Sequence, residues 1–305
     1  MMSCGVFGAD REWYTNRMRI RRGASLDPGE VIDARGSGTG LPLGLLMGGG
    51  GGGIGVLLVL LLLFGVFSGG GGTSSGSGAA GDLASRCTTG AAAEQSSDCR
   101  VVAVVNSVQD YWASALPRRH VRYTDAHTVL YSGETESGCG VASSASGPFY
   151  CPNDKRVYLD LSFFDDLRTQ LGAQGGEFAQ AYVIAHEYGH HVQDLLGTFD
   201  RVGRPTQGPT GTSVRLELQA DCYAGVWAHH AQESNIIQNI TPADIRDALD
   251  AAAAVGDDRI QREETGKVKP DSFTHGTSAQ RDRWFTSGYT SGDTSRCDTF
   301  APASL

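Results

Sequence analysis

The chain has 305 residues, a formal net charge of −9 and an isoelectric point near 5.3, and this length allows one or two domains with a buried core. Hydrophobic residues make up 40% and charged residues 19%, proportions that exclude a wholly disordered chain and a polytopic membrane protein. The acidic balance also argues against nucleic acid as a main partner, because phosphate binding requires a concentrated positive surface.

Residues 41–67 form a candidate membrane segment with the uncharged sequence LPLGLLMGGGGGGIGVLLVLLLLFGVF. As an α-helix this segment would extend about 40 Å, which exceeds the roughly 30 Å of bilayer hydrocarbon. A cleaved signal peptide is the alternative, because the densest apolar part, residues 54–67, has the length of a signal-peptide core. Roughly 50 residues precede that part, far more than a signal peptide carries, so we expect one uncleaved transmembrane helix.

Positive charges predict the orientation of this anchor. A cluster of arginines precedes it, whereas no basic residue follows it until Arg86; the preceding ones include Arg17, Arg19, Arg21, Arg22 and Arg35. The positive-inside rule therefore places the N-terminus in the cytoplasm and the bulk of the chain outside. The expected organisation is a cytoplasmic tail (1–40), an anchor (41–67), a flexible Gly- and Ser-rich tether (68–81) and an extracytoplasmic domain (82–305).

Cysteine usage agrees with an oxidising location for this domain. Six of the seven cysteines lie beyond the anchor, and Cys4, which precedes it, is expected to be free. Six cysteines allow fifteen pairings, and six reduced, buried thiols are the alternative to any of them. Nearest-neighbour pairing would join Cys87 to Cys99 and Cys139 to Cys151, and would leave Cys222 with Cys297.

The rest of the chain predicts a helix-rich α+β domain. Apolar periodicity, capping residues and β-branched runs indicate its elements. We expect helices at 101–116, 177–196, 213–233 and 278–285, another that begins at Thr241-Pro242, and strands at 121–131 and 156–161.

The chemistry concentrates in the predicted helix 177–196, where His186-Glu187-Tyr188-Gly189-His190 matches the pattern H-E-x-x-H. Residues four apart lie on one face of a helix, so His186 and His190 can share one zinc ion. Glu187 is offset from that face and is placed to act as a general base toward water. The alternative interpretation is that these residues form an exposed polar stripe on the helix. The turn before the motif is apolar, however, which indicates a buried helix. Gly189 also indicates the close approach of another element.

A catalytic zinc ion takes three protein ligands. The extended pattern with a third histidine is absent, because Gln193 and Leu196 occupy the positions where it needs Gly and His. In the next predicted helix, Glu217 and Asp221 again lie four apart. We expect Glu217 to be the third ligand and Asp221 to accept the free ring N–H of a zinc histidine, His186 being preferred. The reverse assignment, and an ordinary solvated carboxylate pair, are the alternatives.

These motifs resemble a known family. HEYGHHVQDLLG and ELQADCYAGVWA, with CGVASSASGPFYCP before them and FTHGTSAQR after them, are similar to the bacterial neutral zinc metallopeptidases over Met18 to Phe300. That family is similar to gluzincins, in which an E-x-x-x-D helix supplies a glutamate ligand and a supporting aspartate. The resemblance implies a zincin-like fold, one Zn²⁺ and a peptide or protein substrate. It also implies a location at the bacterial cytoplasmic membrane.

Other candidate roles follow from the same interpretation. An additional donor is expected to stabilise the tetrahedral oxyanion, and His275 is preferred to Tyr223 or Arg281, although His275 could also be an ordinary surface residue. His191, His229 and His230 are interpreted as solvated. The alternative functions are a zinc-stabilised, catalytically inactive binding module and an anchored scaffold without metal. The ligand set favours the enzyme over the binding module, because structural zinc sites usually have four protein ligands and prefer cysteine.

Overall fold

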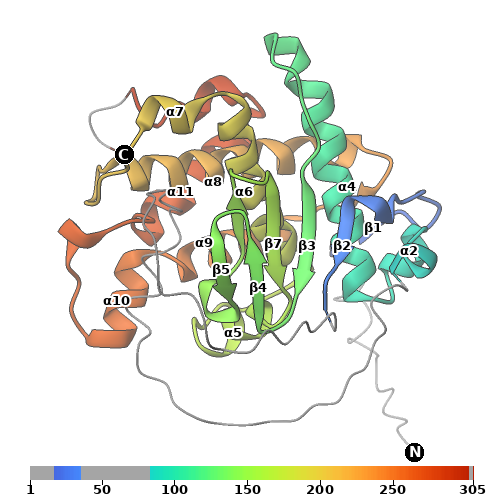
Figure 1. Ribbon diagram of the computed structural model, residues 1–305, viewed down its shortest axis with the longest axis horizontal. Coiled ribbons are helices and arrows are strands. Elements are labelled where there is room, and N and C mark those ends of the chain that lie inside the picture. The colour runs from blue at the N-terminus through green and yellow to red at the C-terminus, as the bar shows by residue number, and fades with distance from the viewer. Residues whose placement is uncertain (1–16, 36–82, 302–304) are drawn as a thin grey trace, which may run out of the picture.

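The computed structural model of the chain describes residues 17–35, 83–301 and 305 (Figure 1). The predicted anchor and tether, residues 41–67 and 68–81, lie outside these residues, as does Cys4. Within the part of the chain that is described, no helix has the length and apolar character needed to cross a membrane.

The described residues form a helix-rich α+β fold, as expected from the sequence. The strands are β1 (Arg19–Ile20), β2 (Val31–Asp33), β3 (His127–Tyr131), β4 (Glu134–Ser137), β5 (Gly140–Ser143), β6 (Phe149–Cys151), β7 (Arg156–Asp160) and β8 (Ile237–Gln238). The α-helices are α2 (Leu83–Arg86), α3 (Gly90–Ala93), α4 (Ser97–Ala115), α5 (Phe163–Thr169), α6 (Glu177–Leu195), α7 (Thr198–Val202), α8 (Thr212–His230), α9 (Pro242–Ala254), α10 (Asp257–Thr265) and α11 (Ser278–Ser291).

A four-stranded sheet in the order β2-β3-β7-β6 lies in the middle of the molecule, with the N-terminal strands toward one end and α10 toward the other (Figure 1). Strands β2, β3 and β7 are parallel, and β6 runs antiparallel to β7. The last four residues of β3 are buried, as are those of β7, which explains why both strands consist largely of β-branched, aliphatic and aromatic residues.

The two long predicted helices that carry the chemistry are present as α6 and α8, and glycines allow them to pack closely. A Cβ atom on Gly189 of α6 would lie 2.9 Å from the Cα atom of Ala220 on α8. This contact confirms the expectation that another element approaches Gly189. Helix α11 also packs closely against α8. A Cβ atom on Gly288 of α11 would lie only 2.0 Å from the carbonyl oxygen of Cys222 on α8. α11 is also longer than the predicted 278–285, since it continues to a left-handed cap at Gly292.

Three disulfides join the cysteines in the nearest-neighbour pattern. They link Cys87 to Cys99, Cys139 to Cys151 and Cys222 to Cys297. The last bond connects α8 to the segment that follows α11, next to the close contact between these two helices.

Residues 18–35 do not form a tail separate from the domain that begins at residue 82. Strand β1 pairs with β8, and β2 is the edge strand of the central sheet beside β3. Met18, Ile20 and Leu26 are each at most 5% exposed and belong to the main core. The sequence interpretation missed this because it assigned the arginines to a topology signal, although they occupy the exposed positions of an alternating pattern.

Candidate metal centre and catalytic cleft

Helices α6 and α8 bring three of the predicted site residues to one point. His186 and His190 lie one turn apart on α6, and Glu217 faces them from α8. The His186 Nε2 atom lies 3.2 Å from Glu217 Oε2, and His190 Nε2 lies 3.4 Å from Glu217 Oε1. One possible ligand atom from each residue lies within 4.8 Å of the other two, and all three side chains are buried.

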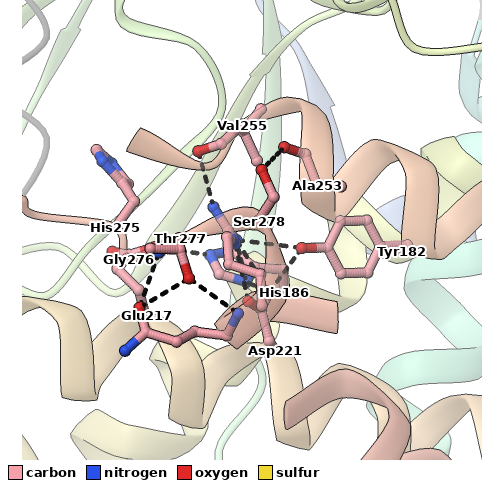
Figure 2. A network of polar contacts seen from close by, with 12 residues as sticks. Tyr182, His186, Glu217, Asp221, Ala253, Val255, His275, Gly276, Thr277 and Ser278 are labelled. Atoms are coloured by element: carbon pink, nitrogen blue, oxygen red, sulfur yellow. Dashed lines mark hydrogen bonds and ion pairs between the residues drawn. The ribbon is translucent and has the colours of Figure 1, made fainter. Parts of the chain in front are cut away.

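Asp221 orients His186 through the ring nitrogen that faces away from Glu217. The His186 Nδ1–H group donates to Asp221 Oδ1 at 2.8 Å, and Tyr182 Oη donates to the same oxygen at 2.6 Å (Figure 2). Arg281 of α11 holds the carboxylate with two bonds, from Nε to Oδ2 at 2.8 Å and from Nη2 to Oδ1 at 2.9 Å. This bidentate pair fixes the carboxylate and with it the His186 ring, so the other ring nitrogen, Nε2, faces Glu217.

A different set of groups orients His190. Its Nδ1–H group donates to Gln193 Oε1 at 2.8 Å. The Gln193 amide donates to the carbonyl oxygen of Leu216 at 2.7 Å and to Gln219 Oε1 at 3.2 Å. The Gln219 amide in turn donates to the carbonyl oxygen of Cys297 at 2.8 Å. Each amide orientation is thus fixed by its partners, and the Nε2 atom of His190 remains directed at Glu217.

The donor set and its supports fit a catalytic zinc ion. Two imidazole nitrogens and one carboxylate make the three-ligand set typical of hydrolytic zinc sites. Both ligand histidines donate their other ring N–H to a fixed acceptor, which is the arrangement that zinc ligands adopt. His186, His190 and Glu217 would therefore hold the ion, with Asp221 and Gln193 supporting the two rings.

The charges around the centre favour a cation. Burial alone would lower the pKa of His186, but Asp221 and Glu217 raise it to about 10. Burial would raise the pKa of Glu217, yet the neighbouring His190 and His186 hold it well below its usual range. Asp221 likewise has its pKa lowered to about 2, because Arg281 and His186 outweigh its burial. Both carboxylates are therefore ionised, and their negative potential acts on the ligand nitrogens.

Glu187 is buried beside this centre with its Oε2 atom lacking a hydrogen-bond partner among the described residues. A buried carboxylate oxygen without a partner is costly, and such an atom in a native fold requires an explanation. Burial raises the pKa of Glu187, against the opposing effect of His186 and His190. A carboxylate with a raised pKa that faces a cleft is suited to accept and return a proton.

His275 is held at the other side of the centre by a loop built on Asp257. The Asp257 Oδ2 atom accepts the backbone N–H groups of Thr274, His275 and Gly276 at 2.7–2.8 Å. The other oxygen, Oδ1, lies 3.3 Å from His275 Nδ1. Burial opposes protonation of the ring, but this carboxylate and Glu217 raise the pKa of His275. The structure thus places His275 in a buried, braced position and not on an exposed surface loop.

These groups line one cleft. Its polar side chains are His186, Glu187, His190, Glu217, His275 and Arg281, and its apolar walls are formed by Pro148, Phe163, Val183 and Val255, with Ser146, Gly147 and Tyr182 completing the lining. A few convergent polar groups within apolar walls are typical of a small-molecule or peptide site.

The four remaining candidates, three histidines and one tyrosine, lie outside the centre. His191 is fully buried, which corrects its interpretation as solvated: its Nε2–H group donates to the carbonyl oxygen of Thr124 at 2.7 Å, and Nδ1 lies 3.0 Å from Tyr150 Oη. His229 is exposed and His230 is partly exposed. Tyr223 packs against Trp112 in the core and is not among the residues that line the cleft.

The comparisons with known proteins identify the family. The sequence profile of the family described as "Putative neutral zinc metallopeptidase" matches residues 18–300. The chain belongs to this metallopeptidase family. The matched range contains every residue of the centre and also residues 18–35, which pack on the domain.

Relatives in this metallopeptidase family include two bacterial proteins that carry no described activity in their names. The "Uncharacterized protein Rv2575" of Mycobacterium tuberculosis is 54% identical over 228 residues, which cover 72% of this chain and 76% of the relative. The "Uncharacterized protein YpfJ" of Escherichia coli is 48% identical over 202 residues, which cover 65% and 69%. No solved structure matches the chain.

Sequence reasoning missed several residues that support this candidate metal centre. Gln193 was used only to exclude a longer motif, although it lies three residues after His190 on the same helix, where side chains meet. The partnership of Arg281 with Asp221, and that of Asp257 with His275, join residues far apart in the sequence. No local pattern could have indicated these two pairs.

We expect Gln193→Ala to lower the affinity for zinc by about 10- to 100-fold, because the ring of His190 would lose the acceptor that fixes its orientation. Competition of the purified protein against a chromophoric zinc chelator measures this affinity. The matched control is Gln170→Ala, which removes an exposed glutamine at the C-terminal end of α5. This variant should bind zinc as the wild type does. Equal affinities of the two variants would contradict the role given to Gln193.

Proposed function

We propose that this protein is a zinc-dependent metallopeptidase that hydrolyses peptide bonds, with Glu187 as the general base. The observation that carries the proposal is the convergence of His186, His190 and Glu217 within a cleft that also contains the partnerless Glu187 oxygen. The family description supports the same activity. The fold that we propose is gluzincin-like, with the small sheet packed on α6 and with α8 packed against α6 instead of against the sheet.

Zinc bound by this ligand set would supply Lewis acidity, which lowers the pKa of water toward neutrality and polarises a carbonyl group. Glu187 accepts the proton of the attacking water, and its raised pKa favours return of that proton to the leaving amine. No residue forms a covalent bond to the substrate. The peptide chain lies along the cleft, where Val183, Phe163 and Val255 favour apolar side chains beside the bond that is cleaved.

His275 is the preferred donor to the oxyanion that develops at the cleaved carbonyl. Its ring lines the cleft, and Asp257 holds it and favours its protonated form. Arg281 also lines the cleft, but it donates to Asp221 through Nε and Nη2 and so serves to position His186. A donor held in place before the reaction stabilises the negative charge that appears in the transition state.

The substrate is a peptide or protein, and the site is expected to hold one zinc ion. Action at the membrane stays a prediction that rests on the sequence of residues 41–67. The alternative of a zinc-stabilised, inactive binding module keeps the ion but gives Glu187 no chemical role.

We expect Glu187→Gln to retain zinc and to lose hydrolysis of a peptide library by about 10²- to 10⁴-fold, because the amide cannot accept the proton of water. Mass-spectrometric detection of products and metal analysis of the same samples give both readouts. A chelator should abolish the wild-type activity and added zinc should restore it. Glu177→Gln, an exposed glutamate of the same helix, is the control. Wild-type protein that holds zinc but cleaves no peptide would favour the binding module.

His275→Ala should lower kcat by about 10²- to 10³-fold with a small change in KM, because the lost donor acts mainly on the transition state. Steady-state kinetics on a peptide identified by the library digest separate the two constants. His229→Ala removes an exposed histidine and serves as the control. An unchanged kcat would show that His275 only supports the loop.

A further inference from the structure

The segment of residues 17–35 is integrated into the catalytic domain through its backbone. Arg21 N–H donates to the carbonyl oxygen of Ile236 at 2.7 Å, and Leu26 N–H donates to that of Thr88 at 3.0 Å. Farther along, β2 pairs with β3 in parallel register. The segment therefore contacts three regions of the domain that lie far apart in the sequence.

Side chains of the segment and of α4 also hydrogen-bond across this contact. Asn106 of α4 is 4% exposed, and its amide accepts from Asp27 N–H at 2.7 Å and donates to the carbonyl oxygen of Asp27 at 3.0 Å. The same amide also donates to the side chain of Glu30, so without the segment it would lose all of these partners. Arg35 donates to Asp98 of α4 at 2.9 Å, so the end of the segment is also held.

Gly90, the first residue of α3, lies directly against the N-terminal segment. A Cβ atom at this position would lie 2.0 Å from the carbonyl oxygen of Arg21 and 3.1 Å from the side chain of Ile20. All of the nearest atoms belong to the N-terminal segment. A side chain is therefore excluded at position 90 only if the segment is docked.

This packing conflicts with the predicted membrane topology. A single crossing by residues 41–67 would place residue 35 and residue 83 on opposite sides of roughly 30 Å of hydrocarbon. Hydrogen bonds of about 3 Å cannot form between groups so separated. The arginines that suggested a cytoplasmic N-terminus, Arg19 and Arg21 among them, lie on the exposed face of the docked segment.

We propose that residues 17–35 are a constitutive part of the catalytic domain and lie on the same side of the membrane as residues 83–301. A cytoplasmic N-terminus and an extracytoplasmic domain, as predicted from charge alone, then cannot both hold. The docking of residues 17–35 does not depend on whether the domain is a peptidase.

One test measures whether Gly90→Ala raises or lowers the melting temperature of the full-length protein. Gly90→Ala should lower the melting temperature by about 3–10 °C, because the added methyl group collides with the docked segment. Gly23→Ala is the control, since a Cβ atom there meets nothing within 4 Å. In an undocked chain, alanine at this helical position would be neutral or stabilising. A Gly90→Ala protein at least as stable as the Gly23→Ala protein would overturn the proposal.

A second test addresses the compartment directly. Arg19→Cys and Asn235→Cys, two exposed positions near the β1–β8 pair, are introduced separately into a full-length Cys4→Ser chain. Spheroplasts that contain each chain are treated with a membrane-impermeant thiol reagent before and after lysis. We expect both cysteines to react at the same stage. Reaction of one before lysis and of the other only after lysis would overturn the proposal.

Discussion

The candidate centre depends on how closely two helices can approach. Gly189 of α6 lies against Ala220 of α8, and a single methyl group at position 189 would come within 2.9 Å of the facing backbone. The contact lies within one turn of His186 and His190 on one helix and of Glu217 on the other. Because ligand atoms must converge on one ion, the distance between these helices sets the distance between the ligands.

Burial makes the electrostatics of this centre interdependent. Three carboxylates, those of Glu187, Glu217 and Asp221, lie within the same buried region and would repel one another without cations. Arg281 compensates Asp221 from α11, a helix that packs closely on α8 at Gly288. The ionised Glu217 leaves a negative potential at the ligand nitrogens, where a divalent cation would bind. Burial raises the pKa of Glu187, which suits this side chain to proton transfer.

Local patterns predicted the parts of the site that lie within single helices. The spacing of His186 and His190, and that of Glu217 and Asp221, depends only on helical periodicity, so sequence reasoning placed these residues on common faces. It also predicted α6 and α8 and the helix-rich α+β class. Strands β4, β5 and β6 were not predicted, because each has only three or four residues, which is too short for an alternating pattern to be recognised.

Long-range contacts account for the other differences. The docking of residues 17–35 could not be inferred, since alternating burial at Met18 and Ile20 is too short a pattern to separate from a charged tail. His191 was taken as solvated because helical rotation turns it from the ligand face, but Tyr150 of β6 and the Thr124 carbonyl cover it. In each case the missing information was the identity of the neighbouring element.

The most direct test of the account is a crystal structure of the purified protein with anomalous diffraction collected on both sides of the zinc absorption edge. We expect one zinc peak about 2.0–2.2 Å from His186 Nε2, His190 Nε2 and a carboxylate oxygen of Glu217. A protein that carries no zinc at this point, or whose zinc lies beyond the reach of Glu217, would contradict the assignment of these three ligands.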